Sequence, residues 1–145
     1  MQSAYANVLK RRVDEEQIMP APGDFPAQGK VARRSCAPPD ERALELCEGL
    51  IDIAAALFNV SGKDLRRAGR TSLDVSRVRQ IAMYVAHVVL RLNMTDIGRG
   101  FGRDRTTVMH SCHLIEDLRD DQDFDSIVLM VERVALAAFR NRLGL

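Results

Sequence analysis

The chain has 145 residues, enough for one domain with a core that needs no disulfide or metal to fold. Apolar residues make up 46% and charged residues 28%, a globular composition that excludes disordered and collagen-like chains. Tryptophan is absent and aromatic residues reach only 5%, which disfavours a β-sandwich and favours helices packed through aliphatic side chains.

The net charge of +1 hides an uneven distribution. Residues 61–113 carry ten Lys and Arg against four Asp and Glu. The flanking segments are acidic, with one basic residue against five acidic ones in 40–60 and four against seven in 114–145. A localised basic segment is typical of phosphate-binding proteins, although solvated helix faces also carry such charge.

The cysteines and the apolar runs indicate the compartment. The three cysteines are odd in number and widely spaced, which favours reduced thiols over a disulfide framework. The first residues contain no apolar stretch of the signal-peptide kind. The longest apolar runs, such as 53–58, are too short to span a membrane. We therefore expect a cytoplasmic protein without a membrane partner.

Residues 1–38 have the composition of a flexible, Pro- and Gly-containing extension. Four of the five prolines lie there with two glycines, and apolar periodicity is weak. A short helix within 4–16 stays open as an alternative. The sequence predicts that the folded domain covers residues 39–145 and that it does not depend on the extension.

Helical spacing of apolar residues predicts the elements of this domain. The expected helices cover 40–58, 63–68, 75–92, 96–101, 105–118 and 127–143, with Ser61, Thr95 and Asp104 as N-caps and Asn59 and Asn93 as stops. The acidic residues 120–125 are expected to be a linker or cap. No stretch alternates as a strand does, so the predicted fold is all-α, a helical bundle containing a helix-turn-helix.

The helix-turn-helix prediction rests on two short helices joined by a Gly-containing turn around 100–103. The second helix must bury Val108, Cys112 and Ile115. Its opposite side and its start then carry polar residues of the types that read DNA grooves: Arg103, Asp104, Arg105, Thr106, His110 and His113. Polar residues also cap helices, so the pattern alone leaves both roles open.

Two segments resemble the C-terminal DNA-binding domain, domain IV, of the bacterial chromosomal replication initiator DnaA. Residues 78–84, VRQIAMY, are similar to the family pattern A-R-Q-I-A-M-Y-L. Residues 96–110, DIGRGFGRDRTTVMH, are similar to E-I-G-R-x-F-G-G-R-D-H-T-T-V-L-H. The similarity runs from about residue 50 to residue 118, in the right order and at the right separation.

The resemblance implies a role for each matching residue in binding an A·T-rich, asymmetric DnaA box. It places Arg103, Asp104, Thr106 and Thr107 in the major groove, His110 near the DNA, Arg79 and Gln80 on the phosphate backbone, and Arg70 in the minor groove. Arg105 stands where the family usually has histidine, and one glycine of the family's Gly-Gly pair is missing before Arg103. We include Arg105 among the DNA-binding residues and expect it to alter base preference.

The predicted function is sequence-specific binding of double-stranded DNA at DnaA-box-like sites, regulating replication initiation or transcription from the nucleoid. The alternative is a protein-interaction regulator that binds replication-control proteins with little DNA binding. The loop at 69–74, which is less basic than the family's, the near-zero net charge and the acidic C-terminal third favour this alternative. No G-x-x-x-x-G-K-[ST] motif occurs, so we expect no nucleotide, no cofactor and a stand-alone relative without the ATPase module. We also expect no catalytic site and no metal. Residues 121–132 resemble a calcium loop in spacing, but Ser126 replaces its glycine.

Overall fold

The computed structural model describes residues 2–10, 40–67, 69 and 71–144. These residues form seven helices and no strand: α1 (Gln2–Leu9), α2 (Glu41–Phe58), α3 (Gly62–Arg66), α4 (Leu73–Val88), α5 (Met94–Phe101), α6 (Arg105–Leu118) and α7 (Gln122–Phe139). The all-α prediction is confirmed.

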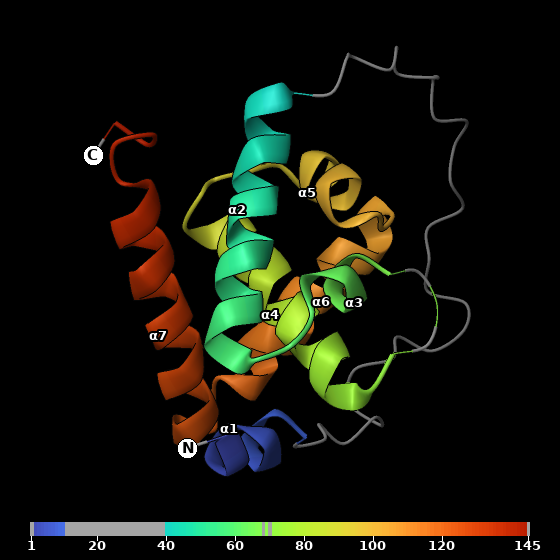
Figure 1. Cartoon of the computed structure of the whole chain (residues 1–145), viewed down its shortest axis with the longest axis vertical. Helices are drawn as coiled ribbons and strands as arrows, with labels where there is room; N and C mark the ends of the chain where they lie inside the picture. The colour runs from blue at the N-terminus through green and yellow to red at the C-terminus, as the bar shows by residue number, and fades with distance from the viewer. Residues whose placement is uncertain (1, 11–39, 68, 70, 145) are drawn as a thin grey trace.

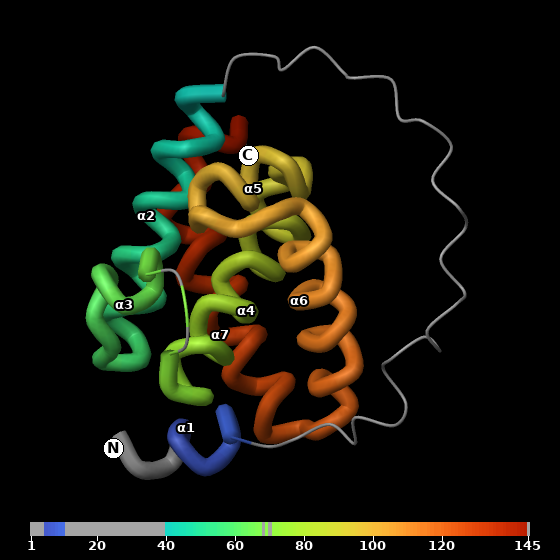
Figure 2. The backbone as a smooth tube through the Cα atoms, turned by 90° about the vertical axis from the view of Figure 1, so that its right-hand side faces the viewer, coloured from blue at the N-terminus to red at the C-terminus, as the bar shows by residue number. Residues whose placement is uncertain are grey.

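Helix α4 is the centre of the bundle. It contacts every other helix of the described ranges, and Figures 1 and 2 show the others arranged around it. Three of its apolar residues, Val78, Ile81 and Val85, are completely buried. Helix α2 also packs against α5 and α7, and α5 packs against α6. Residues 77–79 and 81–86 of α4 are buried, Arg77 and Arg79 among them, and the exposed residues of the helix are Leu73 and Val88.

Several predicted helix boundaries differ from the structure, and the connection between α4 and α5 shows why. Helix α4 ends at Val88 rather than at Leu92, and Arg91 takes a left-handed φ of 59°. Asn93, not Thr95, caps α5: its side-chain oxygen accepts the N–H of Asp96 at 2.8 Å. The apolar residues between the two helices still pack, with Leu90 only 3% exposed, so periodicity there indicates burial but not helix.

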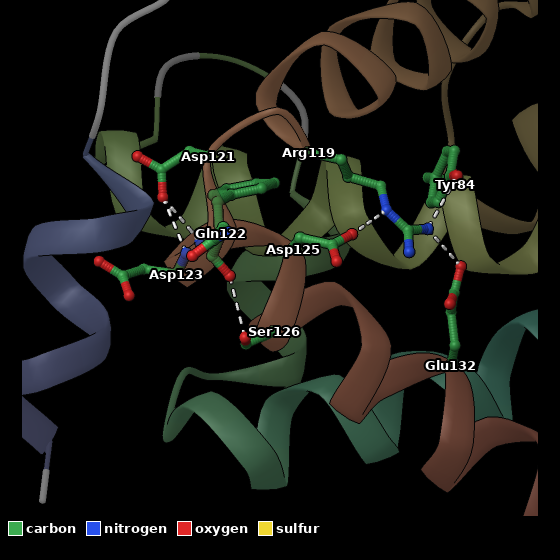
Figure 3. A network of polar contacts seen from close by, with 9 residues as sticks. Tyr84, Arg119, Asp121, Gln122, Asp123, Asp125, Ser126 and Glu132 are labelled. Atoms are coloured by element: carbon green, nitrogen blue, oxygen red, sulfur yellow. Dashed lines mark hydrogen bonds and ion pairs between the residues drawn. The ribbon is translucent and has the colours of Figure 1, made fainter.

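Helix α7 begins five residues before its predicted start. The Asp121 carboxylate accepts the N–H groups of Asp123 and Phe124 at 3.0 and 3.1 Å, so part of the acidic linker is an N-cap. Figure 3 shows this cap beside a second polar cluster. The carboxylates with calcium-loop spacing thus have other partners in the structure.

The second polar cluster fastens α7 to the rest of the bundle. Arg119, just after α6, donates to Asp125 at 2.5 Å and to Glu132 at 2.7 Å, and both acceptors belong to α7. It also donates to the Tyr84 hydroxyl of α4 at 3.1 Å (Figure 3). One guanidinium therefore joins α4, α6 and α7, and we call Arg119, Asp125, Glu132 and Tyr84 the Arg119 cluster.

The structure differs from the sequence prediction at the N-terminal extension. Residues 2–9 are helical and pack against α4 and α7, and Leu9 is 3% exposed. The buried Arg77 of α4 donates from Nε to the Leu9 carbonyl at 3.1 Å. The extension therefore contributes to the core through its first helix, while residues 11–39 lie outside the described residues. The division of the chain at residue 39 stays a prediction.

We expect Leu9→Ala to lower the free energy of unfolding by about 2 kcal/mol, because it removes a buried side chain at the edge of the core. The exposed Asn7 of the same helix gives the matched control, and Asn7→Ala should change stability by less than about 0.5 kcal/mol. Urea denaturation of both variants checks this. Equal stabilities would mean that α1 does not pack in solution.

Candidate nucleic-acid interface

Helices α5 and α6 and the turn between them form the predicted helix-turn-helix. Gly102 ends α5 with a left-handed φ of 65°, and the N–H of Arg103 donates to the Gly98 carbonyl at 2.8 Å. A side chain at Gly98 would place its Cβ 2.5 Å from the Arg103 carbonyl oxygen. Gly102 is the one residue of this turn with a positive φ, so a single glycine satisfies its backbone although the family has a Gly-Gly pair here.

The first turn of α6 presents polar side chains on a rigid backbone. Asp104 is its N-cap, and the carboxylate accepts the N–H of Thr107 at 2.7 Å. That backbone hydrogen bond is the main reason why the pKa of Asp104 lies below its ordinary value. The carboxylate is therefore ionised at neutral pH and acts only as an acceptor.

The burial pattern of α6 agrees with the predicted division of its faces. Val108, Cys112 and Ile115 are buried, and burial raises the pKa of the Cys112 thiol to about 11. The opposite side is exposed, while Arg103 and Thr107 are half-buried at its edge. The predicted groove-reading residues that are exposed are Asp104, Arg105, Thr106, His110 and His113, and the acidic Glu116 and Asp117 are exposed near the end of the helix. Five of the nine predicted site residues, 103–107, thus follow one another in the chain.

Two predicted phosphate-binding residues have internal partners in the structure. Arg79 is 6% exposed and donates to the carbonyls of Leu65 at 2.8 Å and Asp64 at 3.0 Å. Gln80 is half-buried and accepts from Nη1 of Arg77 at 3.1 Å. Their contacts with phosphate stay predictions. Arg70, predicted for the minor groove, lies outside the described residues.

Much of the basic charge in residues 61–113 is used inside the protein. Arg66 pairs with Glu48 and, at 3.5 Å, with Asp52, and these contacts tie α3 to α2. Arg77 and Arg79 are buried, and burial lowers the pKa of both. Counting charges along the sequence therefore overestimates the positive surface.

Two exposed cations that the sequence did not single out, Lys63 and Arg67, lie near the start of α6. Lys63 lies on α3 and Arg67 follows its last residue. The Arg67 carbonyl accepts from Nη2 of Arg103 at 2.6 Å, so the end of α3 lies next to the start of α6. The net positive charge of residues 61–113 indicates that some basic residues of this segment are exposed, but the sequence does not show which ones.

Within the described ranges, no helix is both long and apolar enough to cross a membrane. The same residues contain no group of three or more His, Cys, Asp or Glu side chains placed to hold a metal ion.

Comparison with known proteins connects this geometry to a family. The family model of the bacterial DnaA protein helix-turn-helix matches residues 47–115. This segment covers most of α2 and all of α3, α4 and α5, and it ends within α6. It therefore contains the whole polar turn of residues 102–107.

Similar proteins are chromosomal replication initiator proteins DnaA. That of Lachnoclostridium phytofermentans is 32% identical over 92 residues, which are 62% of this chain and 20% of the relative. That of Rhodopseudomonas palustris strain TIE-1 is 44% identical over 72 residues, 49% of this chain and 15% of the relative. That of Nitrobacter hamburgensis is 40% identical over 82 residues, 56% of this chain and 17% of the relative.

The chain thus spans a fifth or less of the length of these curated relatives. The matched family model is a helix-turn-helix, which is a DNA-binding motif. Residues 47–115, with the α5–α6 pair and its exposed polar turn, are a helix-turn-helix domain of the bacterial DnaA type.

Proposed function

We propose that this protein binds double-stranded DNA sequence-specifically at DnaA-box-like sites and thereby regulates replication initiation or transcription. The observation that carries the proposal is the exposed, rigidly capped start of α6 inside the segment that matches the DnaA helix-turn-helix. In this proposal the protein acts by binding, without a catalysed reaction, a nucleotide or a cofactor.

The proposed contacts divide by exposure. Asp104, Arg105 and Thr106 are exposed in the first turn of α6, where side chains of a helix-turn-helix reach base edges. Carboxylate, guanidinium and Thr methyl groups suit cytosine, guanine and thymine respectively. His110 lies one turn further along the same face, and Arg103 and Thr107 border it. In the proposal Lys63 and Arg67 add phosphate contacts.

Binding to two duplexes tests the proposal, one carrying a DnaA box and one with the same bases shuffled. We expect tighter binding to the box, and a log–log salt slope of about −3 or steeper, since each neutralised phosphate contributes about −0.9. Weak, salt-independent binding to both duplexes would overturn the proposal in favour of a regulator that binds replication-control proteins.

Arg105 gives a sharper test of base reading, because arginine pairs with guanine O6 and N7 where the family's shorter histidine does not. We expect Arg105→His to shift the preferred base at one position by about 1–3 kcal/mol. Selection of binders from a random duplex library with both proteins measures the shift. Arg133→His, at an exposed arginine of α7, is the matched control and should leave the motif unchanged. Identical motifs from all three proteins would show that Arg105 reads no base.

A further inference from the structure

The end of α3 is held by side chains from other helices. This helix has five residues, so its carbonyls lack the partners that a longer helix would supply. It contributes one fully buried side chain, Leu65, to the core. The backbone hydrogen bonds and the packing of α3 alone therefore hold its position only weakly.

Arg79 of α4 donates to two of these carbonyls, of which that of Asp64 also accepts the backbone N–H of Arg67 at 3.3 Å. The Nε of Arg79 donates to the Leu65 carbonyl at 2.8 Å and its Nη2 to the Asp64 carbonyl at 3.0 Å. Two parallel donors in a planar fork fix both the distance and the orientation of the acceptor backbone. A lysine ammonium would keep the charge but would not reproduce this fork.

Arg103 supplies a third partner from the other side. Its Nη2 donates to the Arg67 carbonyl at 2.6 Å, and Arg103 itself lies in the turn directly before α6. The turn also approaches this backbone at Gly102, where an added Cβ would lie 3.9 Å from the Arg66 carbonyl oxygen. Three carbonyls, of residues 64, 65 and 67, are thus bound by two guanidinium groups.

We propose that Arg79 and Arg103 are positioning residues, which together hold the carboxyl end of α3 at a fixed place beside the start of α6. The exposed cations Lys63 and Arg67 then address the same duplex as the first turn of α6. We call Arg79 and Arg103 the arginine clamp. That Lys63 and Arg67 contact the same duplex as α6 rests on the proposed function, whereas the clamp itself is a property of the free protein.

The ion pairs of Arg66 with Glu48 and Asp52 are the competing means of holding α3. They are partly exposed, with side chains 36%, 53% and 75% accessible, and pairs of this kind contribute little. The bonds of Arg79 are buried or partly buried, and Arg79 is 6% exposed, whereas the bond of Arg103 to the Arg67 carbonyl is exposed. The buried bonds of Arg79 therefore contribute more than the exposed ion pairs of Arg66 to the position of α3, and Arg103 adds the link to the start of α6.

Hydrogen exchange without DNA tests the clamp. The amides of Leu65 and Arg67 donate within and at the end of α3, and their protection reports its local opening. We expect Arg103→Gln and Arg79→Lys each to lower this protection at least about tenfold, the effect of losing a charge-assisted hydrogen bond. Arg105→Gln removes the same charge two residues away and should leave it unchanged.

Buried amides of α2 report global stability in the same samples. Arg79→Lys is expected to act locally, but if it lowers protection throughout the protein, the test rests on Arg103→Gln, because Arg103 is half-exposed. Unchanged protection of the α3 amides in Arg103→Gln would overturn the clamp.

A double-mutant cycle measured on a DnaA-box duplex tests whether the clamp couples the cations of α3 to DNA binding. We expect Lys63→Gln to weaken binding about threefold in the unaltered protein and in Arg105→Gln, but less than about 1.5-fold in Arg103→Gln, where α3 is no longer held. Additive effects, or no effect of Lys63→Gln, would overturn the coupling. If the unaltered protein binds no DNA while the exchange result holds, the proposed function and the coupling fail, and the clamp stands.

Discussion

Gly98→Ala should abolish specific DNA binding with the protein still folded. The new Cβ would lie 2.5 Å from the carbonyl oxygen of Arg103, which is backbone and has no rotamer to change. The turn must move, and with it the cap and first turn of α6. We expect the loss of at least about 3 kcal/mol of binding free energy on a DnaA-box duplex, the worth of two or more base contacts.

The same substitution should lower the free energy of unfolding by about 2 kcal/mol. Overpacking costs about 1–3 kcal/mol and outweighs the better helix propensity of alanine. Thr95→Ala, at an exposed position of the same helix, is the control and should change neither property measurably. Chemical denaturation and duplex titration of both variants check the prediction. Unaltered DNA binding by Gly98→Ala would show that the α5–α6 turn does not set the binding surface.

Arg119→Met should cost about 2–3 kcal/mol of stability, because it leaves Asp125 and Glu132 half-buried without their cation. Methionine keeps much of the apolar stem, so the loss reports the guanidinium rather than a cavity. The guanidinium also lies 5.7 Å from the Tyr84 ring centre and adds a cation–π contact with α4.

Arg133→Met is the matched control, since Arg133 is exposed on the same helix α7. It should change the free energy of unfolding by less than about 0.5 kcal/mol. Urea denaturation followed by circular dichroism measures both variants. A loss of equal size in the two would mean that charge removal, and not the Arg119 cluster, explains the effect.

Sequence periodicity predicts the helices well where one apolar face meets one core. Helix α6 has its predicted bounds and its predicted cap, Asp104, because apolar spacing and capping residue agree there. The end of α4 is predicted four residues too late, because Leu90 is buried by packing that has no helical origin. The start of α7 is predicted five residues too late, because the acidic run at 120–125 fits a linker as well as a cap, and Asp121 caps the helix.

The site was predictable in composition but not in side-chain partners. The polar turn at 103–107 is visible in the sequence as a resemblance and as a helix start. Whether an arginine faces DNA or the protein depends on the carbonyls near it in the fold, as Arg79 shows at the end of α3. A helix near the start of the chain was an open alternative, but its packing was not predicted, because its few apolar residues are buried by α4 and α7, which are distant in sequence.

The N-cap of α6 restricts how this protein can evolve new DNA targets. Asp104 is the N-cap of α6 and also belongs to the proposed DNA-reading surface, so a substitution there changes the stability of the helix as well as the contact with DNA. Only Asn, Ser and Thr replace an aspartate cap with a comparable side-chain acceptor. Few side chains at this position can therefore change the target sequence and still cap the helix. The adjacent Arg105 and Thr106 do not cap the helix, so capping does not restrict their substitution.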